Sequence, residues 1–478
     1  MGTLSEDHLV IEEIHRFPNE PIKVFGTLRW NVLQILDELK NGLFKVAARG
    51  YHIESMSVDS WGVDYVYVRG KEPLLTFPYS YRDPRTDGAL EKAFALVPAD
   101  LIYCETGIQF LQMNTLYQLL DDLDHRPEIL ELSTEFLGIA DYFNYLFSGI
   151  CCAEESLAST TQLFNPRERK WSRQLIEKFG LPARVFPKLV QSGTRLGPLL
   201  GGIGDEMGLH DAQVVAGCSH DTAAAVAAVP AEGRDWCYLS SGTWSVMGIE
   251  LEEPIINPSS RAYGFANEMG YGGTIRFLKN IVGLWVVQEC RREWAKEGHE
   301  YAYDDLTRMA EESEPLKCLI DPAASRFVKP GLMPQKIISY CHETDQAPPN
   351  THGEIVRCVL ESLALMYRRV LREIVTIIGQ EPKYVHIVGG GSKNQLLNQL
   401  TANATQLAVL AGPSEATAIG NILAQAIALG HLGSLIDLRR VVRHSFPVTL
   451  YRPEDAPTWL KAYERFQKLT IKSQANHV

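Results

Sequence analysis

Apolar and polar positions along the chain switch repeatedly between the period of two residues typical of strands and the helical period of three to four. Residues 9–17 (LVIEEIHRF) and 57–70 (SVDSWGVDYVYVRG) predict strands, and residues 31–50 predict a helix between them. Residues 354–379 predict a long amphipathic helix. The order of strand, polar turn and helix recurs in both halves of the chain. It predicts an α/β protein with two similar lobes.

A break in this pattern predicts a domain boundary. A strand-rich stretch begins near residue 212, stops at Pro230–Gly233, and is followed by the segment WCYLSSGTWSVMGIE at 236–250. The length of 478 residues allows two to four domains of ordinary size. We therefore predict one domain over 1–230 and a second over 231–478.

Composition and charge narrow the class of protein. The chain is 45% hydrophobic and 22% charged, which is typical of globular proteins rather than fibrous or disordered ones. Its formal net charge of -12 disfavours nucleic acid as a partner. Nine cysteines without a Cys-x-x-Cys spacing indicate reduced, mostly buried thiols. No signal peptide and no long apolar run is found, so we expect a cytoplasmic protein without membrane contact, whose oligomeric state stays open.

The segment VVAGCSHDTAAAVAAV at 214–229 carries the strongest candidate for catalysis. An apolar strand leads into Ser219, His220, Asp221 and Thr222, and an alanine-rich helix follows. Asp221 at the helix start could be an ordinary N-cap. Alternatively, it is a general base at the carboxyl end of a strand, where open α/β sheets bind their ligands. The local sequence does not separate these two roles.

Two glycine-containing turns are candidates for phosphate binding. The first, Ser240–Thr243, lies between two predicted strands, and the second, Gly389–Gly391, follows a strand and precedes a helix. Such turns bring backbone N–H groups and hydroxyls close to phosphate oxygens. A plain hairpin and a tight turn without ligand are the alternatives. The chain has neither the G-x-G-x-x-G fingerprint nor a P-loop.

Polar residues in the first half suit a polyhydroxylated ligand. Trp61, Gly62 and Asp64 interrupt a strand pattern, and Arg82 and Asp83 lie at a predicted turn. Each sugar hydroxyl needs a directed partner, which side chains of this kind supply. The alternative is a solvated turn with Trp61 in the core.

Many segments of the chain, taken in order, resemble the FGGY family of carbohydrate kinases. They include SVDSWGVDY, YRDPRT, TGIQFLQMNTLYQL, SHDTAAAV, SSGTWSVMG, RFLKNIVGLWVVQ and VHIVGGGSKNQLLNQLTA, and the similarity runs from about residue 10 to about residue 450. DSWGVD, SHDT and SGTWSVMG resemble the branch of the family that phosphorylates L-rhamnulose. The resemblance implies two actin-like lobes of the ribonuclease H type with a central cleft, and ATP and Mg²⁺ as cofactors.

The resemblance also implies roles for individual residues. Asp221 would be the base that accepts the proton of the C1 hydroxyl of a ketose, which is then phosphorylated. The residues implied in sugar binding are Gly62, His220, Thr222 and Asn280, and those implied in ATP binding are Thr243, Gln288, Gly390 and Gly391. The Mg²⁺ ligands are not implied by any matching residue.

One family feature has no counterpart in this chain. Members of the fold begin with a strand carrying Asp-x-Gly, a turn that holds the ATP phosphates, and a second strand, but no Asp of this chain has Gly two positions later. The strand at 9–17 resembles the third strand of the family. We therefore expect that Met1 is an internal methionine, that the first lobe lacks its first strand, and that roughly 15–20 residues would restore the phosphate loop.

The missing loop predicts weak or absent kinase activity for the 478-residue chain. ADP release with rhamnulose and MgATP measures this activity, and the codons upstream of Met1 provide an independent check. An upstream reading frame without an Asp-x-Gly strand-turn-strand would contradict the expectation. Two alternatives to an active kinase stay open: a degenerate or truncated kinase that acts as a sugar-binding regulator, and an actin-like structural or chaperone ATPase.

Overall fold

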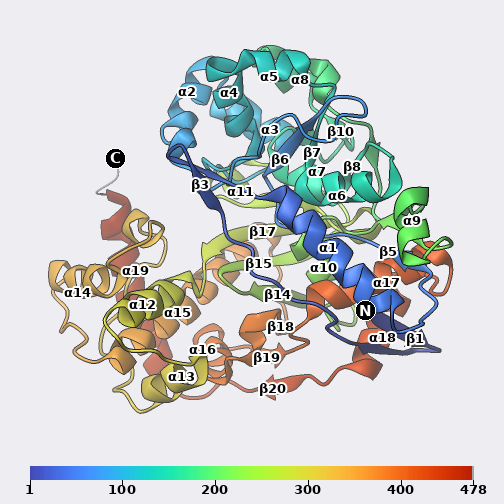
Figure 1. Cartoon of the computed structure of the whole chain (residues 1–478). Coiled ribbons are helices and arrows are strands. Elements are labelled where there is room, and N and C mark those ends of the chain that lie inside the picture. Colours follow the sequence, from blue (N-terminus) through green and yellow to red (C-terminus); the bar gives the residue numbers. More distant parts are fainter. Residues whose placement is uncertain (476–478) are drawn as a thin grey trace. The chain divides into compact units, whose positions relative to one another are not determined.

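The chain divides into two units in the computed structural model, which describes residues 1–475 and the side chains of residues 1–470 (Figure 1). It first crosses from unit 1 to unit 2 between Ala228 and Val229. The division of the sequence at 230/231 stays a prediction for the functional domains. Unit 1 consists of residues 1–228, 250–277 and 417–445, and unit 2 consists of residues 229–249, 278–416 and 446–478.

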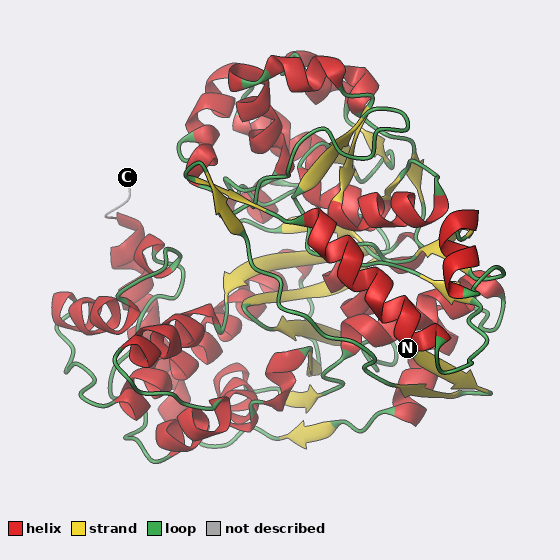
Figure 2. Ribbon diagram, in the orientation of Figure 1, coloured by secondary structure: helices red, strands yellow, loops and turns green. Residues whose placement is uncertain are grey.

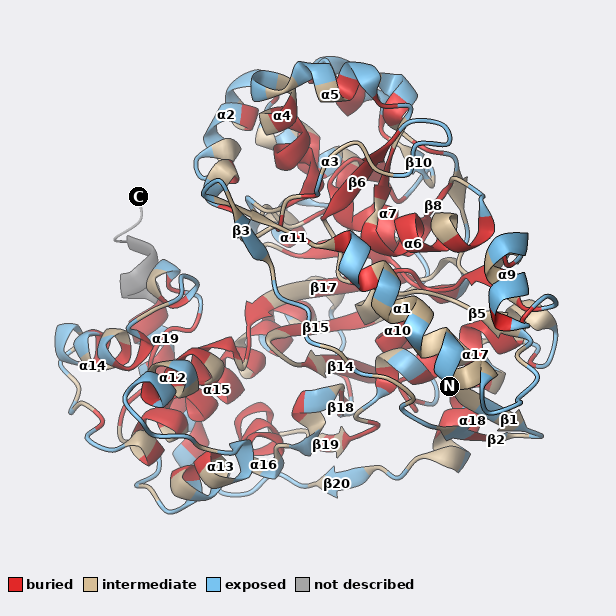
Figure 3. Ribbon diagram, in the orientation of Figure 1, coloured by how far each residue is buried: buried red, intermediate tan, exposed pale blue. Residues whose placement is uncertain are grey.

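Strand β6 (Tyr65–Val68) separates two parts of the core of unit 1. Its period of two places Tyr65 and Tyr67 in one apolar cluster and Val66 and Val68 in another, so all four residues are buried (Figure 3). The first cluster receives side chains from helices α2, α3, α4, α5 and α8, and the second from helices α1, α6 and α9. The strand predicted over 57–70 is thus confirmed only for its second half, because most of the preceding residues form a loop.

A three-stranded sheet in unit 1 places the loop that carries Asp221. Strand β13 (Gln213–Ala216) pairs in parallel with β5 (Ser55–Met56) and antiparallel with β12 (Thr194–Pro198). Because β5 and β13 are parallel, the loops that follow them leave the same edge of the sheet. Helix α10 (Asp221–Ala227) begins directly after the loop of β13.

The N-terminal segment of unit 1 is a hairpin. Strand β1 (Gly2–Ser5) pairs antiparallel with β2 (His8–Ile11), and the backbone N–H of Leu9 donates to Ser445 Oγ at 2.8 Å. The strand predicted over 9–17 therefore ends after its first residues. The absence of a family-type first strand stays a prediction.

Helix α17 (Ala416–Leu429) packs tightly against helix α10 in unit 1. A Cβ atom on Gly420 would lie well inside van der Waals contact with the carbonyl oxygen of Ala224. Glycine at this position therefore allows the two helix backbones to approach.

The remaining helical and strand segments of unit 1 are β3 (Ile22–Val24), β4 (Thr27–Arg29), α1 (Val32–Ala47), η1 (Pro84–Thr86), α2 (Ala89–Leu96), α3 (Ala99–Thr106), α4 (Thr115–His125), α5 (Pro127–Leu132), β7 (Glu135–Gly138), α6 (Ile139–Ser148), β8 (Ala153–Glu154), α7 (Glu155–Ala158), η2 (Ser159–Thr161), β9 (Phe164–Asn165), β10 (Lys170–Trp171), α8 (Arg173–Lys178), η3 (Ala183–Val185), β11 (Leu189–Val190), α9 (Gly201–Met207), α11 (Pro258–Ala262), β16 (Ala266–Met269), η4 (Tyr271–Gly273) and α18 (Leu435–Ser445).

The largest sheet has its strands in the order β16-β17-β15-β14-β18-β19-β20, and those from β17 to β20 can be followed as successive arrows in Figures 1 and 2. β14 (Trp236–Ser241) forms the predicted hairpin with β15 (Trp244–Leu251), and it pairs in parallel with β18 (Tyr384–Val388). The carboxyl ends of β14 and β18 therefore lie at one edge of the sheet. The other segments are β17 (Ile275–Val282), α12 (Trp285–Lys296), α13 (Tyr303–Glu311), η5 (Ser325–Phe327), α14 (Met333–Glu343), η6 (Gly390–Lys393), α16 (Gln395–Thr405), β19 (Ala408–Ala411), β20 (Thr449–Tyr451) and α19 (Ala456–Ala475).

The predicted long helix of unit 2 is confirmed as α15 (His352–Ile378). Thr351 caps it by accepting from the N–H of Glu354 at 3.2 Å, and Gly379 ends it in the left-handed region at φ 73°. Buried side chains follow one another along most of its length. Charged residues interrupt its apolar stretches, and none of the helices within residues 1–475 combines the length and apolar character needed to span a bilayer.

We predict that Gly420→Ala destabilises unit 1 by about 1–3 kcal/mol, because the added methyl group overpacks the contact between α17 and α10. Gly201→Ala in α9 is the matched control, because open space surrounds its Cβ position. Chemical denaturation followed by circular dichroism measures both variants. Equal stability of Gly420→Ala and the parent chain would contradict this account of the packing.

Candidate active site

Backbone hydrogen bonds join the loops that follow β5 and β13 in unit 1. The N–H of Ser60 donates to the carbonyl of Ser219 at 2.9 Å, and the N–H of Asp221 donates to the carbonyl of Ser60 at 2.9 Å. Ser60 and His220 form a parallel β-bridge. The pairing of the two strands thus continues beyond the sheet and brings Asp59 next to Asp221.

Asp221 lies at the start of helix α10 without capping it. His220 occupies the N-cap position, and no side chain makes the capping hydrogen bond. The carboxylate of Asp221 accepts instead from the hydroxyl of Thr222 at 3.0 Å, and its side chain is 41% exposed. The N-cap interpretation of Asp221 is therefore wrong, and the carboxylate is free to meet a ligand.

A buried ion pair orients the ring of His220. Arg276 Nη2 lies 2.9 Å from Glu268 Oε2 and 3.1 Å from His220 Nδ1. Nδ1 of His220 also lies 3.3 Å from Glu268 Oε2. On the other side of the ring, Nε2 lies 3.5 Å from Asp221 Oδ1. The side chains of Arg276 and Glu268 thus fix the orientation of a residue beside the candidate base.

Charge compensation makes this ion pair possible inside the protein. The Arg276 side chain is 0% exposed. Burial acts to raise the pKa of Glu268, but the positive charge of Arg276 and the hydrogen bond from His220 outweigh it, so this pKa is lowered. Neither residue was identified as a candidate from the sequence. The signal in the sequence that could have revealed Glu268 and Arg276 is the presence of charged residues inside the apolar strand segments ANEM and IRFLKNIV.

Asp59 is a second carboxyl group at this site that the sequence analysis missed. Packing around it and the negative charge of Asp221 raise the pKa of Asp59 from 3.8 to about 7. Its Oδ2 accepts from Asn421 Nδ2 at 2.5 Å, and Gln425 Nε2 in turn donates to Asn421 Oδ1 at 2.7 Å. Helix α17 therefore supplies an amide that holds the carboxyl in place. The large sequence separation of Asp59 and Asn421 hid this contact from sequence reasoning.

The carboxyl group of Glu154 supports the loop that carries His220. Its side chain is 0% exposed and accepts from the N–H of Ser219 at 3.0 Å and from the N–H of Ser156 at 3.0 Å. The hydroxyl of Ser192 also donates a short hydrogen bond to Oε1 of the Glu154 carboxyl group. Burial raises the pKa of Glu154, and the serine hydrogen bonds counteract that rise. These contacts give the loop one backbone position.

Gly62 lies in the same loop as Asp59, and it has little room for a side chain. A Cβ atom there would be 2.9 Å from Thr160 Oγ1. Two residues further, the Asp64 carboxylate accepts from Trp30 Nε1 at 2.6 Å and Trp61 Nε1 at 3.0 Å, and burial raises the pKa of Asp64 to about 6. The partly buried Trp61 packs against the core of unit 1, as the alternative interpretation predicted, but Asp64 is buried, so the solvated turn of that interpretation is wrong.

The predicted ATP-binding residues of unit 2 lie on segments that touch one another. Gly391 packs directly against the side chain of Ser241 at the end of β14. The turn after Ser241 accepts two backbone hydrogen bonds from the start of α12, including one from the N–H of Trp285 to the carbonyl of Thr243 at 3.1 Å. Gln288 lies one turn into the same helix. Within unit 2 the structure thus groups Thr243, Gln288, Gly390 and Gly391, while Asn280 lies on β17.

The oxygen donors of unit 1 fit a divalent cation. The negative charge of Asp221 acts on the carboxyl group of Asp59, so a cation bound there would relieve the repulsion between two acids. Mg²⁺ prefers carboxylate oxygens, usually one or two together with phosphate oxygens. Asp59 and Asp221 are therefore the residues of unit 1 that would hold it.

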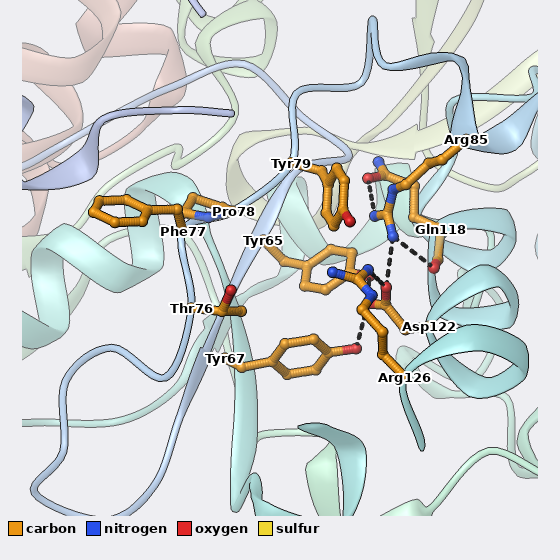
Figure 4. A pocket seen from close by; sticks show the side chains of 10 residues that line it. All are labelled: Tyr65, Tyr67, Thr76, Phe77, Pro78, Tyr79, Arg85, Gln118, Asp122 and Arg126. Atoms are coloured by element: carbon orange, nitrogen blue, oxygen red, sulfur yellow. Dashed lines mark hydrogen bonds and ion pairs between the residues drawn. The ribbon is translucent and has the colours of Figure 1, made fainter. Parts of the chain in front are cut away.

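A separate shallow pocket in unit 1 is filled by its own ion pairs (Figure 4). The carboxylate of Asp122 accepts from Tyr65 at 2.5 Å, from Tyr67 at 2.8 Å and from Arg85 at 2.5 Å, and it forms a further ion pair with Arg126. The arginine charges are thus neutralised from within the protein. This cluster ties β6 to α4 and is part of the core.

Known carbohydrate kinases are similar to this chain over nearly its whole length. The N-terminal domain of the FGGY family of carbohydrate kinases matches residues 8–228, and the C-terminal domain of the same family matches residues 237–429. A rhamnulokinase from Bacteroides thetaiotaomicron is 40% identical over 98% of this chain and 96% of the relative. A rhamnulokinase from Oceanobacillus iheyensis is 39% identical over 94% of each chain.

Solved structures share the fold. A ligand-bound xylulose kinase from Lactobacillus acidophilus superimposes with a TM-score of 0.80 at 17% identity, covering 96% of this chain and 92% of the other. A glycerol kinase from Plasmodium falciparum with ADP gives a TM-score of 0.77 at 16% identity, with coverage of 96% and 92%. The expectation of a two-lobed α/β fold is confirmed by these likenesses.

The raised pKa of Asp59 predicts a pH dependence of stability. The folded chain holds this proton more tightly than the unfolded chain, so the stabilisation is complete below the ordinary pKa of 3.8 and is lost as the pH rises through about 7. Asp64, whose pKa burial raises to about 6, adds a dependence of the same sign. We expect Asp59→Asn to reduce the fall in Tm across this range.

Thermal unfolding between about pH 4 and pH 8 measures the slope. Asp211→Asn, an exposed position in unit 1, is the matched control and should keep the slope of the parent chain. An identical slope for Asp59→Asn and the parent chain would show that Asp59 titrates normally.

Proposed function

Because the chain belongs to the FGGY family of carbohydrate kinases, we propose that it transfers the γ-phosphoryl group of ATP to the C1 hydroxyl of L-rhamnulose or a related ketose. The product would be L-rhamnulose 1-phosphate, formed in the breakdown of rhamnose. The identity of about 40% to rhamnulokinases over nearly the whole chain supports this sugar. The observation that carries the chemistry is the free, half-exposed carboxylate of Asp221 beside the oriented ring of His220.

Asp221 is the general base in this proposal. The sugar hydroxyl gives its proton to the carboxylate, and its oxygen forms a bond to the γ-phosphorus. The bond from that phosphorus to the bridging oxygen of ADP breaks, and ADP leaves with the electron pair. Phosphoryl transfer depends mainly on positioning and charge stabilisation, so one well-placed carboxylate is sufficient as the base on the protein side.

His220 and its neighbours bind and orient the sugar. Nε2 of His220 faces the side of Asp221, where it would contact a sugar oxygen. The hydroxyl of Thr222 already contacts the carboxylate at 3.0 Å and helps to hold it in one rotamer. Gly62, whose Cβ position is already taken up by Thr160, and Asn280 are further proposed sugar contacts.

ATP binds to the turns of unit 2 in this proposal. Gly390 and Gly391 allow the backbone to approach phosphate oxygens, and the hydroxyl of Thr243 and the amide of Gln288 supply further polar contacts. Asp59 and Asp221 would hold Mg²⁺ on the side of the sugar. Mg²⁺, when bound, neutralises negative charge on the phosphates. The nine cysteines are free, which suits the reducing cytoplasm.

We expect Asp221→Asn to lower kcat by about 10²–10⁴-fold, since it removes the proton acceptor and keeps the size of the side chain. The helix should be unaffected, because Asp221 does not cap it. ADP release with rhamnulose and MgATP measures turnover, and calorimetry measures sugar binding. Asp211→Asn is the control of equal charge change. A variant at Asp221 that keeps most of its turnover would refute the role of base.

A screen with rhamnulose, fuculose, xylulose and ribulose tests the choice of sugar. It uses the 478-residue chain and a chain extended by the in-frame residues upstream of Met1. We expect the highest kcat/KM with rhamnulose. Sugar binding without turnover in both chains would favour a regulatory protein, and ATP hydrolysis that is indifferent to all four sugars would favour an actin-like ATPase.

A further inference from the structure

Three cysteines of unit 2 form a buried cluster that the proposed function does not use. Cys318 lies in the loop before η5, Cys341 on α14 and Cys358 on α15. Their Sγ atoms all lie within 4.8 Å of one another, and the three residues are 2%, 0% and 2% exposed. In the part of the chain that the structure describes, no other group of three His, Cys, Asp or Glu side chains comes together in this way.

The loop that carries Cys318 is fixed by hydrogen bonds to α15 and to the segment that follows α14. The N–H of Leu319 donates to Gln346 Oε1 at 2.9 Å, and the N–H of Ile320 donates to Ser362 Oγ at 2.9 Å. The amide of Gln346 also donates back to the carbonyl of Leu319 at 2.8 Å. The three sulfurs are thus held by rigid parts of the fold, as a preorganised ligand set requires.

We propose that Cys318, Cys341 and Cys358 bind one soft monovalent metal ion of the Cu(I) type in a three-coordinate site. Thiolate sulfurs select soft metals. A central ion with metal–sulfur bonds of about 2.3 Å needs sulfurs about 4 Å apart, which small side-chain movements reach from the observed arrangement. Structural zinc sites have four protein ligands, and this group has three. The number of ligands therefore favours Cu(I) over Zn²⁺.

An ion at this site would join three separate segments of unit 2. It would cross-link the loop before η5 to α14 and to α15 without using any residue of the proposed sugar or ATP sites. Binding to the folded chain stabilises it by mass action. The expected result is a higher Tm for the metal-loaded chain, with no new catalytic step.

The test uses the full, reduced chain and Cu(I) supplied without oxygen as its acetonitrile complex. Native mass spectrometry should show one ion per chain, and X-ray absorption at the copper edge should show three sulfurs at about 2.3 Å. Competition with a Cu(I) chelator should show at least about tenfold weaker binding for Cys318→Ser and Cys341→Ala. Cys290→Ala, a buried cysteine of α12 outside the cluster, is the matched control.

The spectrum of the unmodified chain keeps the proposal testable if a variant fails to fold. Fewer than three sulfurs around the ion, or binding that survives substitution of the cluster, would overturn the proposal. Tighter binding of Zn²⁺ than of Cu(I) would also overturn the proposal. A disulfide between two of the three cysteines that resists reduction would do the same. None of these measurements depends on sugar kinase activity. Failure of this proposal can therefore be distinguished from failure of the proposed function.

Discussion

The parallel pairing between the loops after β5 and β13 is the constraint on which the candidate site of unit 1 depends. Two backbone hydrogen bonds through Ser60 fix residues 59–60 against residues 219–221. Backbone pairing of this kind leaves the side chains of both loops free for other contacts. Asp59 and Asp221 therefore meet at the sheet edge although more than 150 residues of sequence separate them. A side-chain contact alone would hold two like charges together much less firmly.

The charged residues around this pairing are arranged so that few of them carry unbalanced charge in the interior. Arg276 and Glu268 neutralise each other while they orient His220. Breaking such a pair by removing one partner leaves a buried charge uncompensated, which costs about 3–5 kcal/mol. Glu154 instead relies on hydroxyl and backbone donors. The loop of His220 is thus supported by one ion pair and one hydrogen-bonded carboxyl, and Asp221 alone keeps an exposed carboxylate.

Sequence patterns predicted the regular elements better than the contacts between them. The hairpin β14–β15 and helix α15 were predicted because their periodicity and turn residues are local properties. The candidate base Asp221 was identified from a local motif. Asp59 and Asn421 were missed because their contact depends on how α17 returns to unit 1 late in the chain. The strand predicted over 9–17 was too long, since alternation continues where no partner strand pairs with it.

The two units differ in how their candidate residues would recognise a ligand. In unit 1 they are side chains with directed donors and acceptors, fixed by the partners described above, as recognition of a specific hydroxyl pattern requires. In unit 2 they lie on turns where Gly391 packs against Ser241 so closely that no side chain fits. Backbone N–H groups on such turns suit phosphate oxygens, which every nucleotide shares. Under the proposed function, a change of sugar preference would therefore involve side chains such as those of His220, Thr222 and Asn280, and could leave the glycine turns of unit 2 unchanged.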